Sequence, residues 1–468
     1  MFLGGWSGSN GMGFDVSVDE RVRLWYKVNA PSGDPNEPDS EHAMETVAKL
    51  LCPSDKTPVA RATLLGQMDL DFLEPVLLKR YKKTPRYKPL AVFRGVLFAK
   101  SGKISGRGLS RYLNAYPEQA RQLGFVNRYG ELDIPSHEHF RTFAQNRVDW
   151  DEIRDMVVVE VCHEARRHGI PFGEEAADDA TMVETVGGDP DAKYNGHYKK
   201  TGHKEDIVTD IATCLPIYNA TIGGTECEGH VFIDGLEHLK GIGIAVKDVW
   251  VDGTYATLEN IATAHTQLGT TMHYQSQESW VMREDGDPEH IQKVYQSFWE
   301  DPEFRAGAEL HEMMRFLVPK GRALKDEGEA MQKSALAEGA WGEERRPRAG
   351  RPSNAERVAQ KRFFDGMRMV EAGSRLLEPV GAFHRNMVME RVRMDPEGLK
   401  KDKGKRQVAE SMNDQLKNDL GLQNSLRVKG IEKVHIHNTM GIVFLLLAAL
   451  HKLRNGVTAG LNSLVGIE

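Results

Sequence analysis

The feature that most constrains the fold is a change in the spacing of apolar residues near Phe172. From about residue 43 to 169, apolar residues recur every three or four positions, which is typical of amphipathic helices. Beyond it, short β-branched or apolar stretches alternate with helical patterns. The stretches are Ala176–Val186, Ile207–Ile222, Asp248–Asp252 and Thr270–Tyr274, and the helical patterns are Leu236–Ile244 and Leu258–Leu268. Three strands in succession, then helix, strand, helix and strand, predict an α/β fold with a mixed sheet and flanking helices.

The rest of the chain falls into segments of different composition. Residues 1–40 are rich in Gly, Ser, Asp and Pro and are predicted to form a flexible arm. Residues 41–170 predict a preceding all-α N-terminal domain of short helices, compatible with helix-turn-helix DNA binding and equally with a plain helical bundle. Residues 276–400 are charged and Met-rich without strand signals, so they predict a mainly helical insertion. Residues 401–468 predict further helices, broken near Gly430.

Composition excludes several classes of protein. The 468 residues are 40% hydrophobic and 28% charged, as in folded soluble proteins. The longest apolar run, Ile442–Leu450, is far shorter than the roughly 20 residues that span a bilayer, so no membrane segment is expected. The N-terminus lacks a basic flank and an apolar signal core, which favours a cytoplasmic protein. The four cysteines form no C-x-x-C pair, so neither a disulfide framework nor a zinc site is indicated.

Positive charge is concentrated in three blocks although the net charge is −7. A run of charge is usually only a solvated face, but local distribution decides whether phosphates can be bound. Nucleic acid therefore stays a candidate partner. The blocks are Lys79–Lys88, which includes two tyrosines, Arg345–Arg351 and Lys400–Arg406.

Three acidic residues stand out by their positions. Phosphodiester chemistry with Mg²⁺ needs two or three carboxylates that converge on one point, because hard cations must be held beside the phosphate. Asp179 lies in the first strand pattern. Asp252 ends the strand pattern Val249–Asp252 and precedes a glycine. Glu410 belongs to a later helical pattern.

Helix geometry gives Glu410 polar neighbours. Arg406, Glu410, Asn413 and Lys417 share one face of the predicted helix, and apolar residues gather on the opposite face. One interpretation is an exposed Arg406–Glu410 pair worth a few tenths of a kcal/mol. The other is a metal carboxylate flanked by two cations and an amide that hold DNA phosphates.

Other residues compete for these roles. Asp178 adjoins Asp179, and strand alternation sends only one of them toward a site. Asp234 could also end a strand, although its segment is expected to open a helix. His137 and His139 are two positions apart on a predicted helix and so point to different sides. His435 and His437 could share a strand face, but no third ligand appears at matching spacing, so structural roles are favoured. No nucleophile elbow or phosphate-binding loop is present, which argues against Ser-His-Asp and ATP-driven chemistry.

The order of these motifs resembles the DDE transposases of bacterial and archaeal insertion sequences. The spacing Arg406-x3-Glu410-x6-Lys417 is similar to the signature Y-x2-R-x3-E-x6-K around their catalytic glutamate, with Lys403 at the Tyr position. The Asp-Ala-Thr and Asp-Gly-Thr-Tyr motifs that begin at Asp179 and Asp252 resemble the first and second aspartate motifs. Four upstream stretches resemble the helical N-terminal domain of this branch: Pro85–Pro89, Gly106–Leu113, Pro117–Phe125 and Pro135–Phe143.

The resemblance implies a fold, a reaction and a metal. The fold is an RNase H-like core formed by residues 171–275 and 401–468 and interrupted by residues 276–400. Asp179 and Asp252 would lie on adjacent central strands, Glu410 on a later helix, and the three would bind two Mg²⁺ ions, with Mn²⁺ as a substitute. The enzyme would cleave transposon ends and join the freed 3′-OH to target DNA by phosphoryl transfer.

The resemblance also implies partners. They are double-stranded DNA, as terminal inverted repeats and as target, and a second copy of the chain in a synaptic complex. The setting would be the prokaryotic cytoplasm, at the nucleoid during action. The residues expected to bind DNA are Arg406, Lys417, Asn413, Lys82, Lys83, Arg86, Lys88, Arg107 and Arg111. Two alternatives stay open: a catalytically inactive transposase-derived DNA-binding protein, and a hydrolytic RNase H-like nuclease.

Overall fold

The computed structural model describes residues 58–185, 187–274, 283–296, 310–342, 352–421 and 428–464. The predicted arm and the basic block Arg345–Arg351 lie outside these ranges. The chain divides into two compact units, one of Met1–Ile153 with Ser463–Glu468 and one of Arg154–Asn462. Each unit is described by itself.

The described part of the first unit consists of short helices. Phe93, Leu97 and Phe98 of α5 are fully buried at its centre. Proline occupies the first position of α5 and of α7, where its missing N–H costs nothing. Ser136 caps α8, as predicted, by accepting a hydrogen bond from the His139 backbone N–H at 3.3 Å. The helices are α3 Pro58–Gln67, α4 Glu74–Lys79, α5 Pro89–Ser101, α6 Gly106–Ala115, α7 Pro117–Gln122, α8 His137–Asn146 and the start of α9 Trp150–Arg167.

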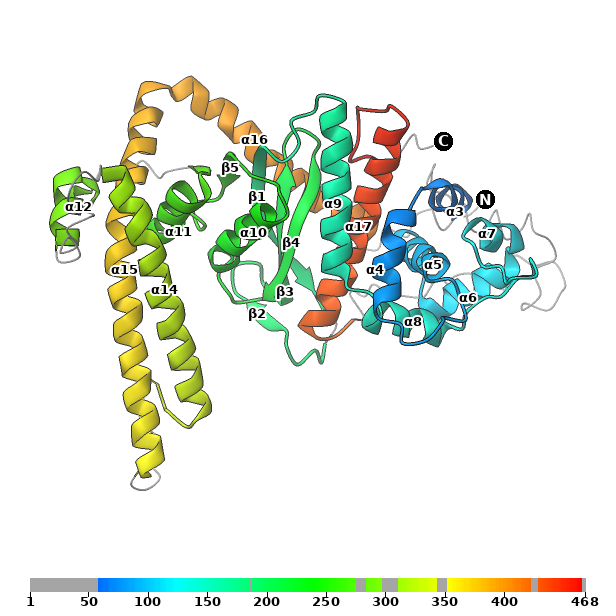
Figure 1. The fold of residues 1–468 in the computed structure, drawn as a ribbon, viewed down its shortest axis with the longest axis horizontal. Helices are drawn as coiled ribbons and strands as arrows, with labels where there is room; N and C mark the ends of the chain where they lie inside the picture. Colours follow the sequence, from blue (N-terminus) through cyan, green and yellow to red (C-terminus); the bar gives the residue numbers. More distant parts are fainter. Residues whose placement is uncertain are drawn as a thin grey trace, which may run out of the picture. The chain divides into compact units, whose positions relative to one another are not determined.

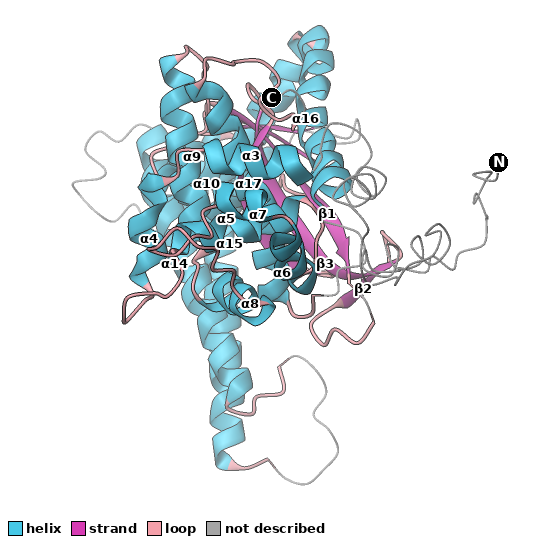
Figure 2. Ribbon diagram, turned by 90° about the vertical axis from the view of Figure 1, so that its right-hand side faces the viewer, coloured by secondary structure: helices cyan, strands magenta, loops and turns pink. Residues whose placement is uncertain are grey.

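The second unit is built on a mixed six-stranded sheet, which confirms the predicted fold class at that level. The strand order is β2-β3-β1-β5-β6, and β4 pairs with β3. Strands β1 to β4 pair antiparallel, whereas β5 and β6 run parallel to β1. Figure 2 shows the strands in magenta, with β1, β2 and β3 labelled. The strands are β1 Glu175–Glu184, β2 Lys193–Asn195, β3 Lys200–Asp210, β4 Leu215–Gly223, β5 Asp248–Val251 and β6 Thr271–Tyr274.

Two strands differ from the sequence prediction. β2 was not predicted, and β3 begins at Lys200 rather than at Ile207. The first half of β3 reads Lys-Thr-Gly-His-Lys-Glu-Asp, which has no apolar run to mark a strand. From Gly202 onward these residues are buried nonetheless, and partners on other elements bind His203, Lys204, Glu205 and Asp206.

Helices cover both faces of the sheet. α10 Gly229–Gly241 and α11 Leu258–Thr263 follow β4 and β5, and the chain returns later with α16 Pro396–Leu420 and α17 Ile431–Arg454. α10 and α17 lie on opposite sides of β3 and β4 (Figure 1). The predicted break near Gly430 is confirmed, since Gly430 has a positive φ of 92° and precedes α17.

A buried carboxylate on β3 joins the sheet to α17. Glu205 is fully buried, and its Oε1 accepts a hydrogen bond from Asn219 Nδ2 on β4 at 2.6 Å. Its Oε2 accepts from Asn438 Nδ2 on α17 at 2.8 Å and from the Thr221 hydroxyl. Thr439 of α17 accepts from Asn219 at 3.0 Å. Charge-assisted hydrogen bonds of this kind offset the cost of burying the carboxylate.

Among the described helices, α17 alone has the length and apolarity to cross a membrane. Its mean hydropathy over the most apolar 18 residues is 1.5, but 72% of that window is buried inside the structure. The helix also carries Asn438 and Thr439, which hydrogen-bond to the sheet. α17 is therefore consistent with the core helix of a soluble protein.

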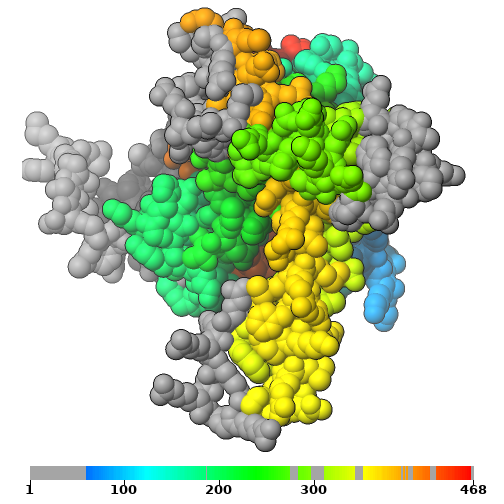
Figure 3. Space-filling model, turned by 90° about the vertical axis from the view of Figure 1, so that its left-hand side faces the viewer, coloured from blue at the N-terminus to red at the C-terminus, as the bar shows by residue number. Residues whose placement is uncertain are grey.

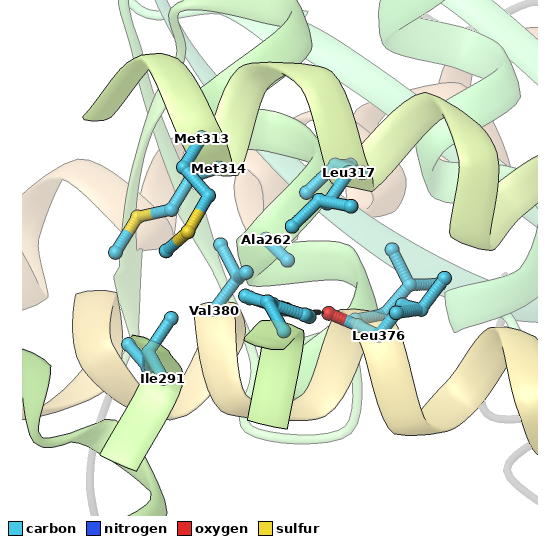
Figure 4. Packing of buried hydrophobic residues seen from close by; sticks show 10 residues of the cluster. Ala262, Ile291, Met313, Met314, Leu317, Leu376 and Val380 are labelled. Carbon is cyan, nitrogen blue, oxygen red and sulfur yellow. Dashed lines mark hydrogen bonds between the residues drawn. The ribbon is translucent and has the colours of Figure 1, made fainter. Parts of the chain in front are cut away.

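The region after β6 is helical where the structure describes it. α12 Pro288–Tyr295 packs against two long helices, α14 Leu310–Ala337 and α15 Asn354–Met394. The predicted capping box of α15 is confirmed: Ser353 accepts from the Glu356 N–H, and Glu356 accepts from the Ser353 N–H. Figure 3 shows α15 as an elongated ridge. Buried side chains of these helices pack together, including Ile291, Met313, Leu317, Leu376 and Val380 (Figure 4).

Glycine allows α14 and α15 to approach closely. A Cβ added at Gly366 of α15 would lie 2.6 Å from the Gly328 carbonyl oxygen of α14, and one at Gly373 would lie 2.5 Å from the Gly321 oxygen. Real Cβ atoms do not come so near, so the two backbones would have to separate.

We expect Gly366→Ala to lower the free energy of unfolding by about 1–3 kcal/mol, through overpacking. Gly404→Ala is the matched control, because Gly404 lies in α16 with nothing within 4 Å of an added Cβ. That substitution should raise stability by up to about 1 kcal/mol through helix propensity. Urea unfolding of both variants measures the difference. Equal effects of the two would contradict the close approach.

Candidate functional site

Two of the sequence-predicted acids lie just beyond the paired part of two parallel strands, Asp179 near the middle of β1 and Asp252 directly after β5. β1 and β5 pair with Ala177 opposite Trp250. Continuing that register by two residues puts Asp252, which directly follows β5, beside Asp179 of β1. Asp179 lies two residues after Ala177, and Asp252 lies two residues after Trp250. Because side chains alternate between the two faces of a sheet, we expect both aspartates on the same face as Ala177 and Trp250.

Helix α16 packs across that face. Ala409 of α16 is buried against Ala177 and Trp250. The ammonium of Lys405, one turn earlier, lies 4.1 Å from the centre of the Trp250 ring and 2.8 Å from a carboxylate oxygen of Glu175. These contacts hold the middle of α16 over β1 and β5, and Glu410 is the next residue after Ala409.

Asn413 connects α16 directly to the first aspartate. Its Nδ2 donates a hydrogen bond to Asp179 Oδ2 at 2.9 Å and lies 3.4 Å from the Asp179 carbonyl oxygen. Asn413 is 3% exposed. Asn413 lies on the predicted polar face of α16, but its side chain is buried and contacts a carboxylate of the sheet.

The three acids influence one another electrostatically. Burial raises the pKa of Asp179 to about 6, and the hydrogen bond from Asn413 and the charge of Arg406 oppose that rise. The negative charges of Glu410 and Asp252 raise the pKa further. Residues far apart in the sequence thus act on one carboxyl group.

The Glu410 side chain forms an ion pair with a residue of its own helix. Arg406 Nη2 lies 2.6 Å from Glu410 Oε1, the i,i+4 pair that the sequence offered as one interpretation. Within the described residues, no three His, Cys, Asp or Glu side chains are arranged to hold a metal ion. The structure brings the three acids into one neighbourhood without closing them into a metal-binding group.

A second pair of aspartates lies on the opposite face of the sheet. Asp178 and Asp206 are fully buried, and the Tyr255 hydroxyl donates to Asp206 Oδ1 at 2.6 Å. Burial and mutual repulsion raise the pKa of Asp178 well above its usual value, and burial raises that of Asp206 to about 7. Sequence reasoning separated Asp178 from Asp179 by strand alternation but missed Asp206, since nothing in its polar surroundings marks a strand.

The remaining predicted site residues fall in several places. Lys417 lies 3.7 Å from Asp414 on the same helix. In the first unit, Arg86 pairs with Asp133 at 3.0 Å and stacks over the Tyr87 ring. The other five predicted DNA contacts of that unit are exposed: Lys82, Lys83, Lys88, Arg107 and Arg111. Asp234 lies in α10, as expected, and His137 and His139 lie in α8. His435 and His437 lie in the helix α17 and not on a strand, so they do not share a strand face.

Comparison of the chain with protein-family models, with curated proteins and with solved structures gave no match.

The raised pKa of Asp179 predicts a pH-dependent stability. Between its ordinary value of 3.8 and about 6 the folded state binds the proton more tightly than the unfolded chain. The unfolding free energy therefore falls as pH rises through that window. We expect Asp179→Asn to be more stable than the parent by roughly 1–2 kcal/mol at pH 7.5, after allowance for partial exposure. The gain should vanish near pH 4. Urea unfolding with EDTA at both pH values measures it, and a pH-independent difference would contradict the assignment.

Proposed function

We propose that this chain is a metal-dependent DNA transposase of an insertion sequence, with an RNase H-like catalytic core of residues 171–275 and 401–468. Its substrates would be the terminal repeats of the element and target DNA. Asp179, Asp252 and Glu410 would form the catalytic centre, and the helical residues 276–400 would be an insertion in the core.

One observation carries the proposal. Asp179 of β1 and Asp252, which directly follows the adjacent parallel strand β5, lie two residues beyond the paired Ala177 and Trp250, and Glu410 follows the residue of α16 that packs on that pair. β1 and β5 are also central in the strand order, as the family resemblance requires. Two acids from distant segments, Glu410 and Asp252, raise the pKa of Asp179 by electrostatic repulsion. Carboxyl groups with a pKa raised in this way are typical of functional sites.

The donor set fits Mg²⁺ by its chemistry. Carboxylate oxygens are the ligands that this cation prefers, and the charges of Glu410 and Asp252 acting on Asp179 are what a divalent cation would offset. Glu410 would have to leave Arg406 to join the other two. When bound, two ions would supply charge neutralisation and an activated water for attack on phosphorus.

The residues of the chain would position the reactants. Asn413 holds Asp179 Oδ2 and leaves Oδ1 free to face the substrate side. Arg406 and Lys417 would bind phosphate oxygens near the scissile bond, and an Arg406 that binds phosphate would release Glu410. In-line phosphoryl transfer depends on such positioning and charge neutralisation rather than on covalent chemistry by the protein.

A non-catalytic DNA-binding protein of the same descent is the second candidate. The Arg406–Glu410 pair and the absence of a closed three-acid group among the described residues favour it. The two candidates differ in whether DNA is cut.

We expect Asp179→Asn, Asp252→Asn and Glu410→Gln each to lower DNA cleavage by at least about 100-fold, because each removes a charge needed in the transition state. The assay incubates purified protein with oligonucleotides that carry the ends of the encoding element, with Mg²⁺ or Mn²⁺ and with EDTA. Asp365→Asn, a half-buried acid of α15 that pairs with Arg368 and is not one of the three candidate acids, is the control and should cleave normally. Cleavage followed by joining to target DNA supports the transposase, and cleavage alone supports the nuclease. Binding without cleavage by the parent protein supports the non-catalytic reading.

A further inference from the structure

The hairpin between β2 and β3 carries aromatic and basic side chains that have no role in the proposed catalytic centre. Its eight residues, Lys193–Lys200, read Lys-Tyr-Asn-Gly-His-Tyr-Lys-Lys and contain no acid. Tyr194 is 61% exposed and Tyr198 37% exposed. Lys193 and Lys199 are exposed and form no ion pair with any residue that the structure describes. Each of the two exposed tyrosines thus stands next to an exposed lysine within one hairpin.

Side-chain hydrogen bonds hold this turn in a defined shape. Asn195 Oδ1 accepts from the backbone N–H of His197 at 2.9 Å and of Tyr198 at 3.1 Å. Its Nδ2 donates to the Gly224 carbonyl oxygen beyond β4 at 2.7 Å. Lys199 completes the turn with a left-handed φ of 53°. The hairpin is thus tied to the sheet before any ligand arrives, which lowers the entropy cost of binding.

Tyr198 places the turn near Asp179 and Asp252. Its hydroxyl donates to the carbonyl oxygen of Ala180, the residue after Asp179, at 3.5 Å. Burial raises the pKa of Tyr198, and the charges of Asp179, Glu228 and Asp252 raise it further. The ring therefore reaches back over β1 to the edge of the candidate site.

The chemistry of the hairpin selects one class of partner. Exposed aromatic rings stack on nucleobases, and lysines bind the phosphates between them. In a duplex the base faces are already stacked, so the tyrosines gain little there. An unpaired strand offers both free base faces and phosphates. The lysines also offset the repulsion that phosphates would meet from Asp179 and Asp252.

We propose that the Lys193–Lys200 hairpin binds an unpaired stretch of nucleic-acid strand and leads it to the carboxylates at Asp179 and Asp252. The inference rests on the proposed function, because it assigns to the same site the form of the DNA that the site receives. Tyr194 and Tyr198 stack on bases, and Lys193 and Lys199 contact phosphates.

The test measures binding separately from cleavage. The full-length chain is titrated in EDTA with a labelled single-stranded oligodeoxynucleotide and with its duplex, each containing 2-aminopurine, whose fluorescence falls when it stacks. The double variant Tyr194→Ala, Tyr198→Ala should lose at least about tenfold in affinity for the single strand, together with the fluorescence change. Duplex affinity should change less than threefold. Phe364→Ala, an equally exposed ring on α15, should change neither.

Salt dependence tests the lysines. Lys193→Ala with Lys199→Ala should reduce the slope of log affinity against log salt by roughly 0.7 for each lysine that contacts a phosphate. Unchanged single-strand binding by the tyrosine variant, or an equal loss for both DNA forms, overturns the proposal.

Asp179→Asn separates this inference from the proposed function. That variant should bind the single strand at least as tightly as the parent does, because it keeps the hairpin and removes a charge that repels phosphates. If Asp179→Asn still cleaves DNA, the catalytic proposal fails while the hairpin result stands. If the parent cleaves and the tyrosine variant binds normally, the hairpin proposal fails alone.

Discussion

The parallel pairing of β1 with β5 is the constraint on which the rest of the site depends. The pairing ends with Ala177 opposite Trp250, and Asp179 and Asp252 each follow two residues after that pair. A shift of register by one residue would send one of the two to the opposite face, where Asp178 already lies. The buried Ala177 and Trp250 fix that register, because both must meet Ala409 of α16.

The carboxylates on the two faces of the sheet lie in different chemical environments. On one face, Asp179 remains partly open and receives an amide hydrogen bond from Asn413. On the other, Asp178 and Asp206 are fully buried, and burial raises the pKa of both carboxyl groups. β1 thus carries two adjacent acids, of which Asp179 is partly exposed and Asp178 is fully buried.

Local sequence signals predicted the elements better than they predicted the contacts. The caps at Ser136 and Ser353 and the break at Gly430 follow from side-chain and backbone chemistry within a few residues, and they were predictable for that reason. The β2–β3 hairpin was not, since its strands are polar and its turn depends on Asn195 reaching Gly224. The spacing of Asp179, Asp252 and Glu410 pointed to one site, but the contact of Asn413 with Asp179 belongs to tertiary packing. A helical wheel places Asn413 on the polar face and cannot show what that face meets.

The Glu205 carboxylate has a consequence for how the chain acquires its structure during synthesis. Its strand partners Asn219 and Thr221 are made soon after it, but Asn438 comes from α17, more than two hundred residues later. Until α17 emerges from the ribosome, Glu205 must stay in water or lie incompletely bonded in the sheet. The central sheet therefore cannot reach its final packing while α14 and α15 are being made, and a chain that stops before α17 exposes a charged, half-covered sheet to proteases.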